Sequence, residues 1–517
     1  MKKNKISIKL VIFLFILIIV FFTSIYTLQK ADYVVSQNVL LGVIIGLLVF
    51  TIIGFIAIIK IYNKKELKPE KALLFILPIF CVLLFIAIPV STGHDERLHW
   101  YRAFEISQGQ LVTPVYKNDR VSLAELPEGI NKISKQVDGK LKYLDNMEML
   151  NEKLNYEESM LISNQYSAVY CFIQYIPEVI GILIGRIITQ VPILIAYCAR
   201  FINMIVCIGI MYFAVKIIPF GKNVLLLLSI IPIAIEAFST ISPDGLTIAI
   251  CALFIAYTLY VAFDKNKKCG TKETVILTVI GIIVSLCKIV YMPLLFLVLI
   301  IPKEKFKSKK DRITSLALII TIGVICNLVW LAFGSMILFN TNANTYLGST
   351  ENGAMIKIIS LLKNPIEYIQ KLFYTLGVNG NQYFLSLFGG QLEWEENIKI
   401  EIIPYVVCGI AAFATISDEK LKNSLNRFQK IIIFLIIFVI VLLIFTSLYI
   451  QWSDNDLLYI DGVQGRYFLP ILPLILFLVG GLKIKSSYSN LAVTKLICIS
   501  SIIIQLYTVT AILAEHL

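Results

Sequence analysis

The sequence contains few charged residues for its length. Asp, Glu, Lys and Arg make up 15% of the 517 residues, whereas hydrophobic residues make up 58% and the mean hydropathy is +0.82. Soluble domains carry about 25% charged residues, so the composition excludes an ordinary soluble protein and is typical of an integral membrane protein. Because apolar runs long enough to cross a bilayer occur along nearly the whole chain, we predict a single membrane domain over residues 1–517.

The sequence also lacks the motifs of nucleotide chemistry and of cysteine frameworks. It contains no glycine-rich phosphate loop and no dinucleotide fingerprint. Every cysteine except Cys269 lies in or beside an apolar run, and no Cys/His spacing suits zinc, so we expect neither disulfides nor structural zinc. The net charge of +12 predicts no nucleic-acid partner, because its lysines gather in short loops between apolar runs.

The apolar runs predict the membrane spans. The single runs expected to cross lie near residues 6–28, 38–62, 70–90, 192–216, 222–240, 245–263, 313–340, 401–416, 430–450, 466–482 and 490–515. The first is expected to be a span and not a cleaved signal peptide, since it is long and lacks a small-residue cleavage site. Basic connectors such as "DKNKKCGTK" and "PKEKFKSKKDR" are expected in the cytoplasm together with the N-terminus. Residues 91–164 and 341–400 then form two large outer loops.

Two segments depart from simple alternation across the membrane. Residues 273–302 have lysine-rich loops at both ends, which a single crossing cannot satisfy, and Lys288 and Pro293 interrupt the run. We predict a broken-helix hairpin whose two short arms meet toward the outer side. Residues 165–189 pose a similar problem and are predicted to be re-entrant or interfacial. The predicted fold is thus an all-α polytopic integral membrane protein with about 13 membrane crossings.

An ionisable stretch, "STGHDERLHWYRAFEISQG" (residues 91–109), follows the third predicted span. Thr92 and Asp95 are spaced to cap a helix that Gly109 would end. The ionisable candidates on that helix are Asp95, Glu96, His99 and Arg102. Asp95 shares a face with the histidine and the arginine, and a carboxylate in a first helical turn stays ionised, which suits a general base or a ligand of a divalent cation. Alternatively, Asp95 only completes a capping box and the other charges meet water.

Two further candidates lie in or beside spans. Lys288, with Tyr291 nearby, sits in an otherwise apolar run, where a lysine is costly and usually marks a partner or a ligand. Its alternative is to extend along the span to the interface. Asp244 lies in "STISPDG", which is a good turn sequence, so a turn role and a functional role stay equally open.

The last cation stands where an outer loop enters a span, in "DGVQGRYFLP". Arg466 is flanked by Gln464 and Tyr467, and the positive-inside bias makes an arginine there unexpected, although an interfacial anchor would also explain it. Arg200 is a weaker candidate, for which pairing with an acid between helices suffices. Acids deprotonate hydroxyls and cations stabilise a departing phosphate. Because the outside of a cell lacks nucleotide sugars, a transferase working there needs a donor on a lipid phosphate.

These stretches resemble the bacterial membrane-protein family known as domain of unknown function 2142. The matching pieces are "DERLHWYRAFEISQG", "YIPEV", "ARFIN", "STISPDG", "CKIVYMPLLFLVLIIP" and "GVQGRYFLPILPL", the last being the most specific. The resemblance implies the GT-C superfamily of lipid-linked sugar transferases, with a GT-C fold whose first large outer loop carries the catalytic acid. That role falls on Asp95, with Glu96 beside it, and His94 stands where the family often has proline.

The leading hypothesis is an inverting glycosyltransferase of the bacterial cytoplasmic membrane, with its site on the outer face. Asp95, with Glu96, is the expected catalytic acid pair and would be the ligand pair for any divalent cation. The donor phosphate would leave into a pocket holding Lys288, Arg466 and Tyr291. The residues expected to bind substrates are His99, Arg102, Asp244, Gln464 and Tyr467. The partners would be the bilayer, a polyprenyl-phosphate-linked sugar and a cell-surface glycan, lipid or protein acceptor. The alternatives are a polysaccharide polymerase and a flippase or transporter of lipid-linked saccharides.

Overall fold

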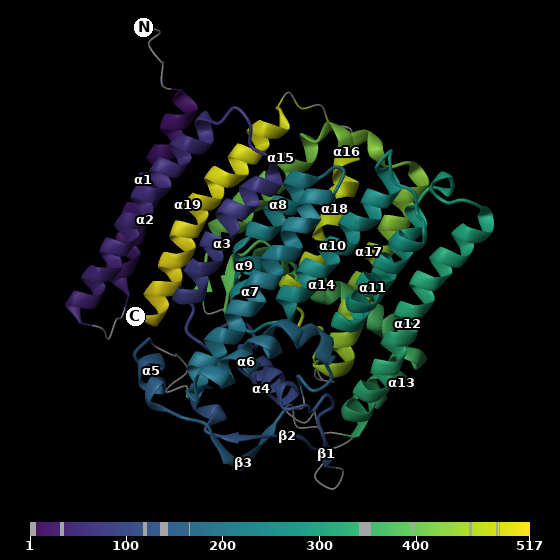
Figure 1. The fold of residues 1–517 in the computed structure, drawn as a ribbon, viewed down its shortest axis with the longest axis horizontal. Coiled ribbons are helices and arrows are strands. Elements are labelled where there is room, and N and C mark those ends of the chain that lie inside the picture. Colours follow the sequence, from purple (N-terminus) through teal and green to yellow (C-terminus); the bar gives the residue numbers. More distant parts are fainter. Residues whose placement is uncertain are drawn as a thin grey trace.

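Helices dominate the computed structural model of the chain. It describes residues 7–31, 36–116, 121–134, 143–164, 166–340, 353–393, 398–453, 457–481, 484, 486 and 488–517. Figure 1 shows a helical bundle with a mixed helix and strand layer, built by residues 91–164, at one end. A large hydrophobic core fills the bundle, and a smaller one, around Trp100 and Phe104, lies beneath that layer.

Among the described residues, eight helices are long and apolar enough to cross a membrane. They are α1 (Ile8–Lys30), α2 (Gln37–Asn63), α3 (Pro69–Ala87), α7 (Pro192–Ile217), α10 (Pro243–Phe263), α12 (Lys309–Asn340), α17 (Arg427–Gln451) and α19 (Asn490–His516). A ninth candidate consists of α8 (Lys222–Ile230) and α9 (Pro232–Ser239), which meet at 64°. The bend falls at Pro232, which has no N–H for the helical ladder. The prediction of an all-α polytopic membrane protein is confirmed, and three further predicted crossings fall on the shorter apolar helices Ile289–Ile300, Ile402–Ile416 and Gly465–Gly480.

The broken-helix hairpin is present. α11 (Thr271–Cys287) ends before Lys288, whose backbone is extended, and η4 (Ile289–Ile300) then runs back along α11. The N–H of Cys269 donates to the carbonyl of Lys305 at 2.8 Å, so the two basic loops that flank the hairpin lie side by side. Lys288 therefore sits at the turn of the hairpin, far from both loops, as the sequence predicted.

Residues 166–189 form no helix long enough to cross a bilayer. After η3 (Phe172–Tyr175), α6 (Ile176–Ile188) is 13 residues long. At 1.5 Å per residue it spans about 20 Å, too little for a hydrocarbon core of about 30 Å. The carbonyl of Gln190, just beyond it, accepts the N–H of Leu154 at 2.9 Å. Both ends of α6 therefore stay on the side of the 91–164 layer, beside α4 in Figure 1.

The 91–164 layer contains strands that the sequence did not predict. Its helices are α4 (Glu96–Ser107), α5 (Tyr143–Glu148), η1 (Ile130–Ser134) and η2 (Met149–Asn151). Its antiparallel sheet has the order β1 (Val115–Tyr116), β2 (Val121–Glu128) and β3 (Asn155–Ser163). Leu126 pairs with Met160 in this sheet. The buried face of β2 includes Ser122 and Ala124, whose small side chains give only a weak alternating hydrophobic pattern.

The C-terminal half places the short helix η8 (Gly465–Ile471) at the centre of the bundle. Its elements are η5 (Lys303–Lys305), α13 (Gly353–Lys363), α14 (Pro365–Leu387), β4 (Gln391–Leu392), β5 (Ile398–Lys399), α15 (Ile402–Ile416), α16 (Glu419–Ser424), η8 (Gly465–Ile471) and α18 (Leu472–Gly480). At the start of η8 the Gly465 N–H donates to Ser386 Oγ at 2.8 Å. A Cβ on Gly465 would lie 2.2 Å from the Tyr383 carbonyl, so only glycine allows this approach.

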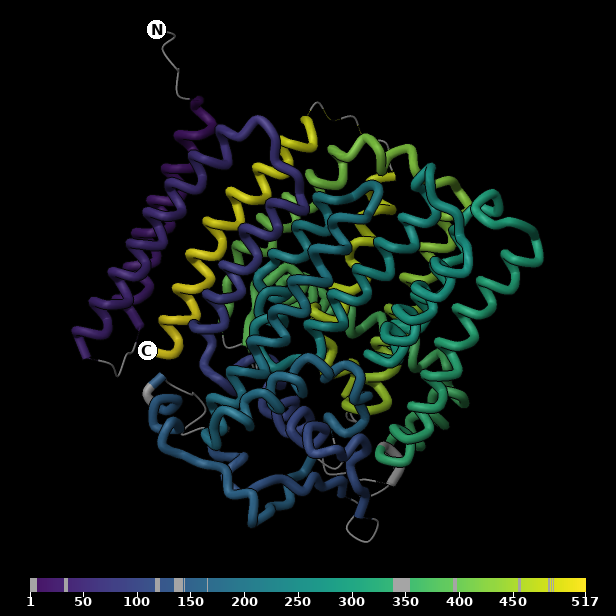
Figure 2. The backbone as a smooth tube through the Cα atoms, viewed as in Figure 1, coloured from purple at the N-terminus to yellow at the C-terminus, as the bar shows by residue number. Residues whose placement is uncertain are grey.

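Two segments at the ends of the chain complete the bundle. The backbone trace in Figure 2 places α19, in yellow, beside α1 and α3, in purple. Residues 341–352 and 394–397 of the predicted second outer loop lie outside the described residues. The rest of that loop contains two helices, α13 and α14, separated at Asn364.

Candidate functional site

The loop that joins α3 to α4 has an unusual backbone. Ser91 and Asp95 adopt positive φ angles of 79° and 56°, a region that few residues other than glycine occupy. The capping box expected at Thr92 is wrong, because its hydroxyl donates to the Pro89 carbonyl and α4 begins only at Glu96. Asp95 makes no side-chain capping bond, so its carboxylate is available for other contacts.

Glu96 points away from that carboxylate into a buried clamp. Its two oxygens accept bonds from the Arg200 guanidinium, Oε1 from Nε and Oε2 from Nη2, both at 2.6 Å. They also accept the backbone N–H groups of Ser91, Gly93 and Ile241 at 2.8–3.3 Å. Arg200 thus pairs with an acid between helices, as expected for this weaker candidate. We call the Glu96–Arg200 pair and these three amides the clamp.

The clamp corrects the expectation of a paired-carboxylate site. Both clamp side chains are fully buried, so Glu96 does not face the surroundings of Asp95. The two adjacent acids therefore do not fit a shared divalent cation. Among the described residues, no three His, Cys, Asp or Glu side chains converge as metal ligands. We derive no step through a metal ion.

Three charged residues from distant parts of the chain converge beside Asp95. Arg466 Nη2 lies 2.5 Å from Asp95 Oδ2, and Arg466 Nε lies 3.5 Å from Asp244 Oδ2. The Lys288 ammonium donates to the other Asp244 oxygen. The two cations thus meet on one carboxylate although they are far apart in sequence, as predicted. We call Asp95, Asp244, Lys288 and Arg466 the charged cluster.

The charged cluster differs from the expected phosphate pocket in one respect. Its two carboxylates balance its two cations, whereas the sequence predicted cations that a phosphate alone would satisfy. Asp244 is therefore more than a turn residue, although its N–H does bond to the Ser242 hydroxyl at the start of α10. Asp95 is the most accessible member, since its side chain retains 28% exposure against 6–12% for the others.

Aromatic rings cover the cations of the cluster. The Lys288 ammonium lies 4.7 Å from the ring centre of Tyr467 and 5.7 Å from that of Tyr170. Tyr291 does not reach the cluster as a phosphate ligand, because its buried hydroxyl donates to the Tyr467 carbonyl at 2.8 Å. It instead holds η8 in place. Gln464 has a buried amide oxygen without a hydrogen-bond partner among the described residues, which leaves it available to a substrate hydroxyl.

The structure separates His99 from Arg102. His99 Nδ1 lies 2.8 Å from the Tyr175 hydroxyl, and its ring packs against Tyr170 beside the cluster. Arg102 is fully buried and pairs with Glu105 at 2.8 Å, so it does not bind substrate with His99 as expected. Its fork also donates to the Leu111 carbonyl at 2.7 Å, which makes it a structural anchor of the outer layer.

Electrostatics hold Asp95 ionised and His99 neutral. Burial raises the pKa of the Asp95 carboxyl, but the charge of Arg466 outweighs this and holds the pKa below its ordinary value. For His99, burial lowers the pKa to about 4, and the opposing charge of Asp95 does not restore it. Near neutral pH the cluster therefore presents a carboxylate that is a weak base beside an uncharged imidazole.

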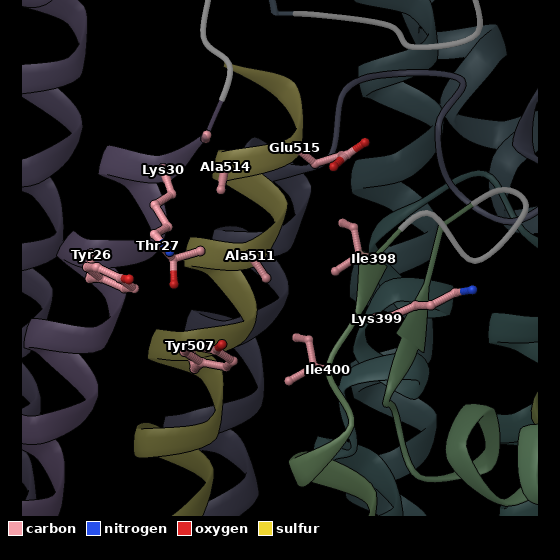
Figure 3. A pocket seen from close by; sticks show the side chains of 11 residues that line it. Tyr26, Thr27, Lys30, Ile398, Lys399, Ile400, Tyr507, Ala511, Ala514 and Glu515 are labelled. Carbon is pink, nitrogen blue, oxygen red and sulfur yellow. The ribbon is translucent and has the colours of Figure 1, made fainter.

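A small cavity adjoins the cluster. Its volume is about 10 Å³, enough for one water-sized group. It is lined by His94, Ile233, Glu236, Ala237, Thr240, Ser242, Asp244, Ile248 and Arg466. A larger cavity of about 490 Å³ lies between α1, α19 and β5, where Tyr507, Ile398 and Ile400 form its walls (Figure 3). The two cavities share no lining residue, so the larger one takes no part in the geometry of the cluster.

Comparison with known proteins places the chain in a family. The model of the family described as predicted membrane protein (DUF2142) matches residues 77–475. The chain belongs to this family. No curated protein and no solved structure matches the chain. The matched region contains every member of the charged cluster and of the clamp, whereas α1, α2 and α19 lie outside it.

This DUF2142 member also has a functional candidate that the sequence reasoning missed. Glu236 is a lone acid in the apolar run "IIPIAIEAF", and an acid in such a run is a functional signal by itself. It lines the small cavity and lies 2.7 Å from His94 Nδ1. From the sequence, His94 stands out only as a departure from the family pattern, so its pairing with Glu236 could not be predicted.

Proposed function

We propose that this DUF2142 member is an integral-membrane inverting glycosyltransferase, which moves a sugar from a polyprenyl-phosphate donor to an acceptor hydroxyl. The observation that carries the proposal is the contact between Asp95 and Arg466. It joins a partly exposed carboxylate to a guanidinium at the mouth of a membrane bundle. A base and a phosphate-binding cation are the two groups that such a transfer needs.

In the proposed reaction, the Asp95 carboxylate takes the proton of the acceptor hydroxyl. The hydroxyl oxygen attacks the anomeric carbon from the face opposite the phosphate. The bond from that carbon to the phosphate oxygen breaks, and its electron pair leaves with the polyprenyl phosphate. Arg466 receives the phosphate through its planar fork and Lys288 through a compact charge.

The charge balance of the cluster supports coupling between donor binding and base activation. While Arg466 bonds to Asp95, the carboxylate is a weak base. A donor phosphate that takes over Arg466 would remove this bond and make Asp95 more basic. Because the adjoining cavity holds about one water, we expect the donor to bind by this exchange of partners and not by filling an existing pocket.

The orientation of the protein is part of the proposal. The basic loops before α11 and after η4 lie together, at the end of the hairpin opposite Lys288. The positive-inside bias supports a cytoplasmic place for these loops. We therefore put the charged cluster and the 91–164 layer on the outer face of a bacterial cytoplasmic membrane. A cell-surface glycan, lipid or protein would be the acceptor there.

The test uses purified protein in lipid vesicles, loaded with radiolabelled polyprenyl-phosphate sugars and a cell-envelope acceptor fraction. We expect label to pass to the acceptor with wild-type protein and to stay on the lipid with Asp95→Asn. A flippase would instead move the labelled lipid between leaflets without transferring the sugar. Lipid movement that is independent of Asp95, with no label on any acceptor, would refute the proposed transfer.

A further inference from the structure

The His94–Glu236 pair has the geometry of an oriented base. Glu236 Oε1 lies 2.7 Å from His94 Nδ1 and accepts the backbone N–H of His94 at 3.2 Å. It also accepts the N–H of Glu393, at 3.2 and 3.3 Å to its two oxygens. A carboxylate that receives these donors is ionised and acts only as an acceptor. His94 therefore carries a proton on Nδ1, and in the neutral imidazole the lone pair is on Nε2.

The free nitrogen belongs to a residue on the wall of the small cavity. His94 Nε2 has no partner among the described residues, and the side chain keeps 9% of its surface exposed while it lines the cavity. Asp244 and Arg466 line the same cavity, and Arg466 also lies 2.5 Å from Asp95, the residue that directly follows His94 in the chain. The titratable and charged groups around the imidazole are Asp95, Glu236, Asp244, Glu393 and Arg466.

A second pair of the same kind holds Glu236 from behind. Glu393, which has a positive φ of 65°, gives its backbone N–H to Glu236 and pairs through its side chain with His516 at 2.6 Å. All three side chains are at least nine-tenths buried. Glu393 and His516 do not line the small cavity, so the second pair offers a matched control.

We propose that His94, oriented by Glu236, is the relay that removes the proton from Asp95 after each transfer. The inference rests on the proposed function. The proton that Asp95 takes from the acceptor hydroxyl passes to His94 Nε2, which restores the Asp95 carboxylate and leaves an imidazolium paired with Glu236. The imidazolium then releases its proton to water, and no other reactant is needed.

The direction of this transfer follows from the neighbours of each group. When the polyprenyl phosphate has left and Arg466 has returned to Asp95, the guanidinium stabilises the ionised carboxylate, so the protonated acid gives up its proton readily. Imidazole is a stronger base than a carboxylate, and the Glu236 carboxylate stabilises the imidazolium that forms.

The first test does not depend on activity. The chain contains three histidines, so ¹⁵N-histidine labelling gives three imidazole spin systems, which His94→Asn, His99→Asn and His516→Asn assign. We expect the His94 signal to show a protonated Nδ1 and an unprotonated Nε2 at about pH 8, and its titration to move in Asp95→Asn. A His94 ring that carries its proton on Nε2, or that is doubly protonated at that pH, would overturn the relay.

The second test measures transfer as a function of pH. His94→Asn keeps a donor for Glu236 but cannot accept a proton, so we expect kcat to fall about 10²-fold with donor KM within about twofold. The acid limb of the wild-type profile should disappear in this variant and persist in His516→Asn. An acid limb retained in His94→Asn would refute the relay while leaving the glycosyltransferase intact. Absence of transfer in wild-type protein would instead refute the proposed function, and the labelling test would still decide the geometry.

Discussion

Replacing Arg200 with methionine tests whether the clamp holds the Asp95 loop. Arg200 forms two 2.6 Å bonds to Glu96 and donates to the carbonyls of Ile88 and Pro89 at 2.7 and 2.9 Å. Removing one partner of a buried ion pair costs about 3–5 kcal/mol. Because Glu96 keeps its three backbone donors, we expect the lower end of that range, about 3 kcal/mol.

The expected loss is measured by unfolding the purified protein in detergent at fixed pH. Lys132→Met is the matched control, because Lys132 pairs with Glu152 at 2.5 Å but both side chains are more than a third exposed. An exposed pair of this kind is worth about 0–1 kcal/mol. We expect the double variant Glu96→Gln/Arg200→Met to be more stable than the two single losses added together, with a coupling of about 1–3 kcal/mol.

The same substitution should also affect the proposed transfer. The clamp fixes the amides of Ser91 and Gly93, which lie on either side of the turn that presents Asp95. Arg200→Met should therefore lower turnover although Arg200 does not touch the charged cluster. The reasoning would be refuted by an Arg200→Met protein as stable as the Lys132→Met control, or by stability losses that simply add in the double variant.

Three further substitutions test individual groups. Asp95→Asn should lower the proposed transfer by about two to four orders of magnitude in a protein that still folds, because Asp95 caps no helix and Arg466 keeps Asp244 as its second carboxylate; near-normal turnover would return Asp95 to a structural role. Arg466→Lys keeps the charge but loses the fork, so donor KM should rise about tenfold, and an unchanged KM would exclude Arg466 as a phosphate ligand. Glu178 is buried without a described ion-pair partner, and burial raises its pKa to about 8. The folded state therefore retains a proton that the unfolded chain releases near pH 4.5, and stability falls as pH rises from about 4.5 to about 8. Glu178→Gln should raise the unfolding midpoint at about pH 9 and leave it unchanged at about pH 5; equal effects at both would show that Glu178 does not titrate.

The sequence predicted the features whose physical cost is local. A lysine in an apolar run and an arginine at an outer entry are costly wherever the chain folds, so Lys288 and Arg466 could be singled out and expected to meet. The broken hairpin followed from two basic loops on either side of one run. Asp244 gave a weaker signal, since its turn sequence explained it equally well. Its place between both cations became visible only when α10, η4 and η8 packed together.

The failed prediction at Asp95 shows where local rules stop. Thr92 and Asp95 have the spacing of a capping box, and an isolated loop would satisfy that box at little cost. In the fold, Glu96 is held by Arg200, which lies 104 positions away, and it draws the amides of Ser91 and Gly93 to itself. The helix then starts later, and Asp95 takes a left-handed conformation that costs about 1–3 kcal/mol.

That cost has a consequence for the candidate site. In a relaxed capping box, the Asp95 carboxylate would bond to backbone N–H groups at the N-terminus of α4 and could not reach Arg466. The strained turn instead leaves the carboxylate partly exposed and 2.5 Å from the guanidinium. Local sequence rules are expected to fail where the rest of the fold overrides them to build a site. The departure at Asp95 is therefore itself a reason to test this residue first, ahead of its neighbour Glu96.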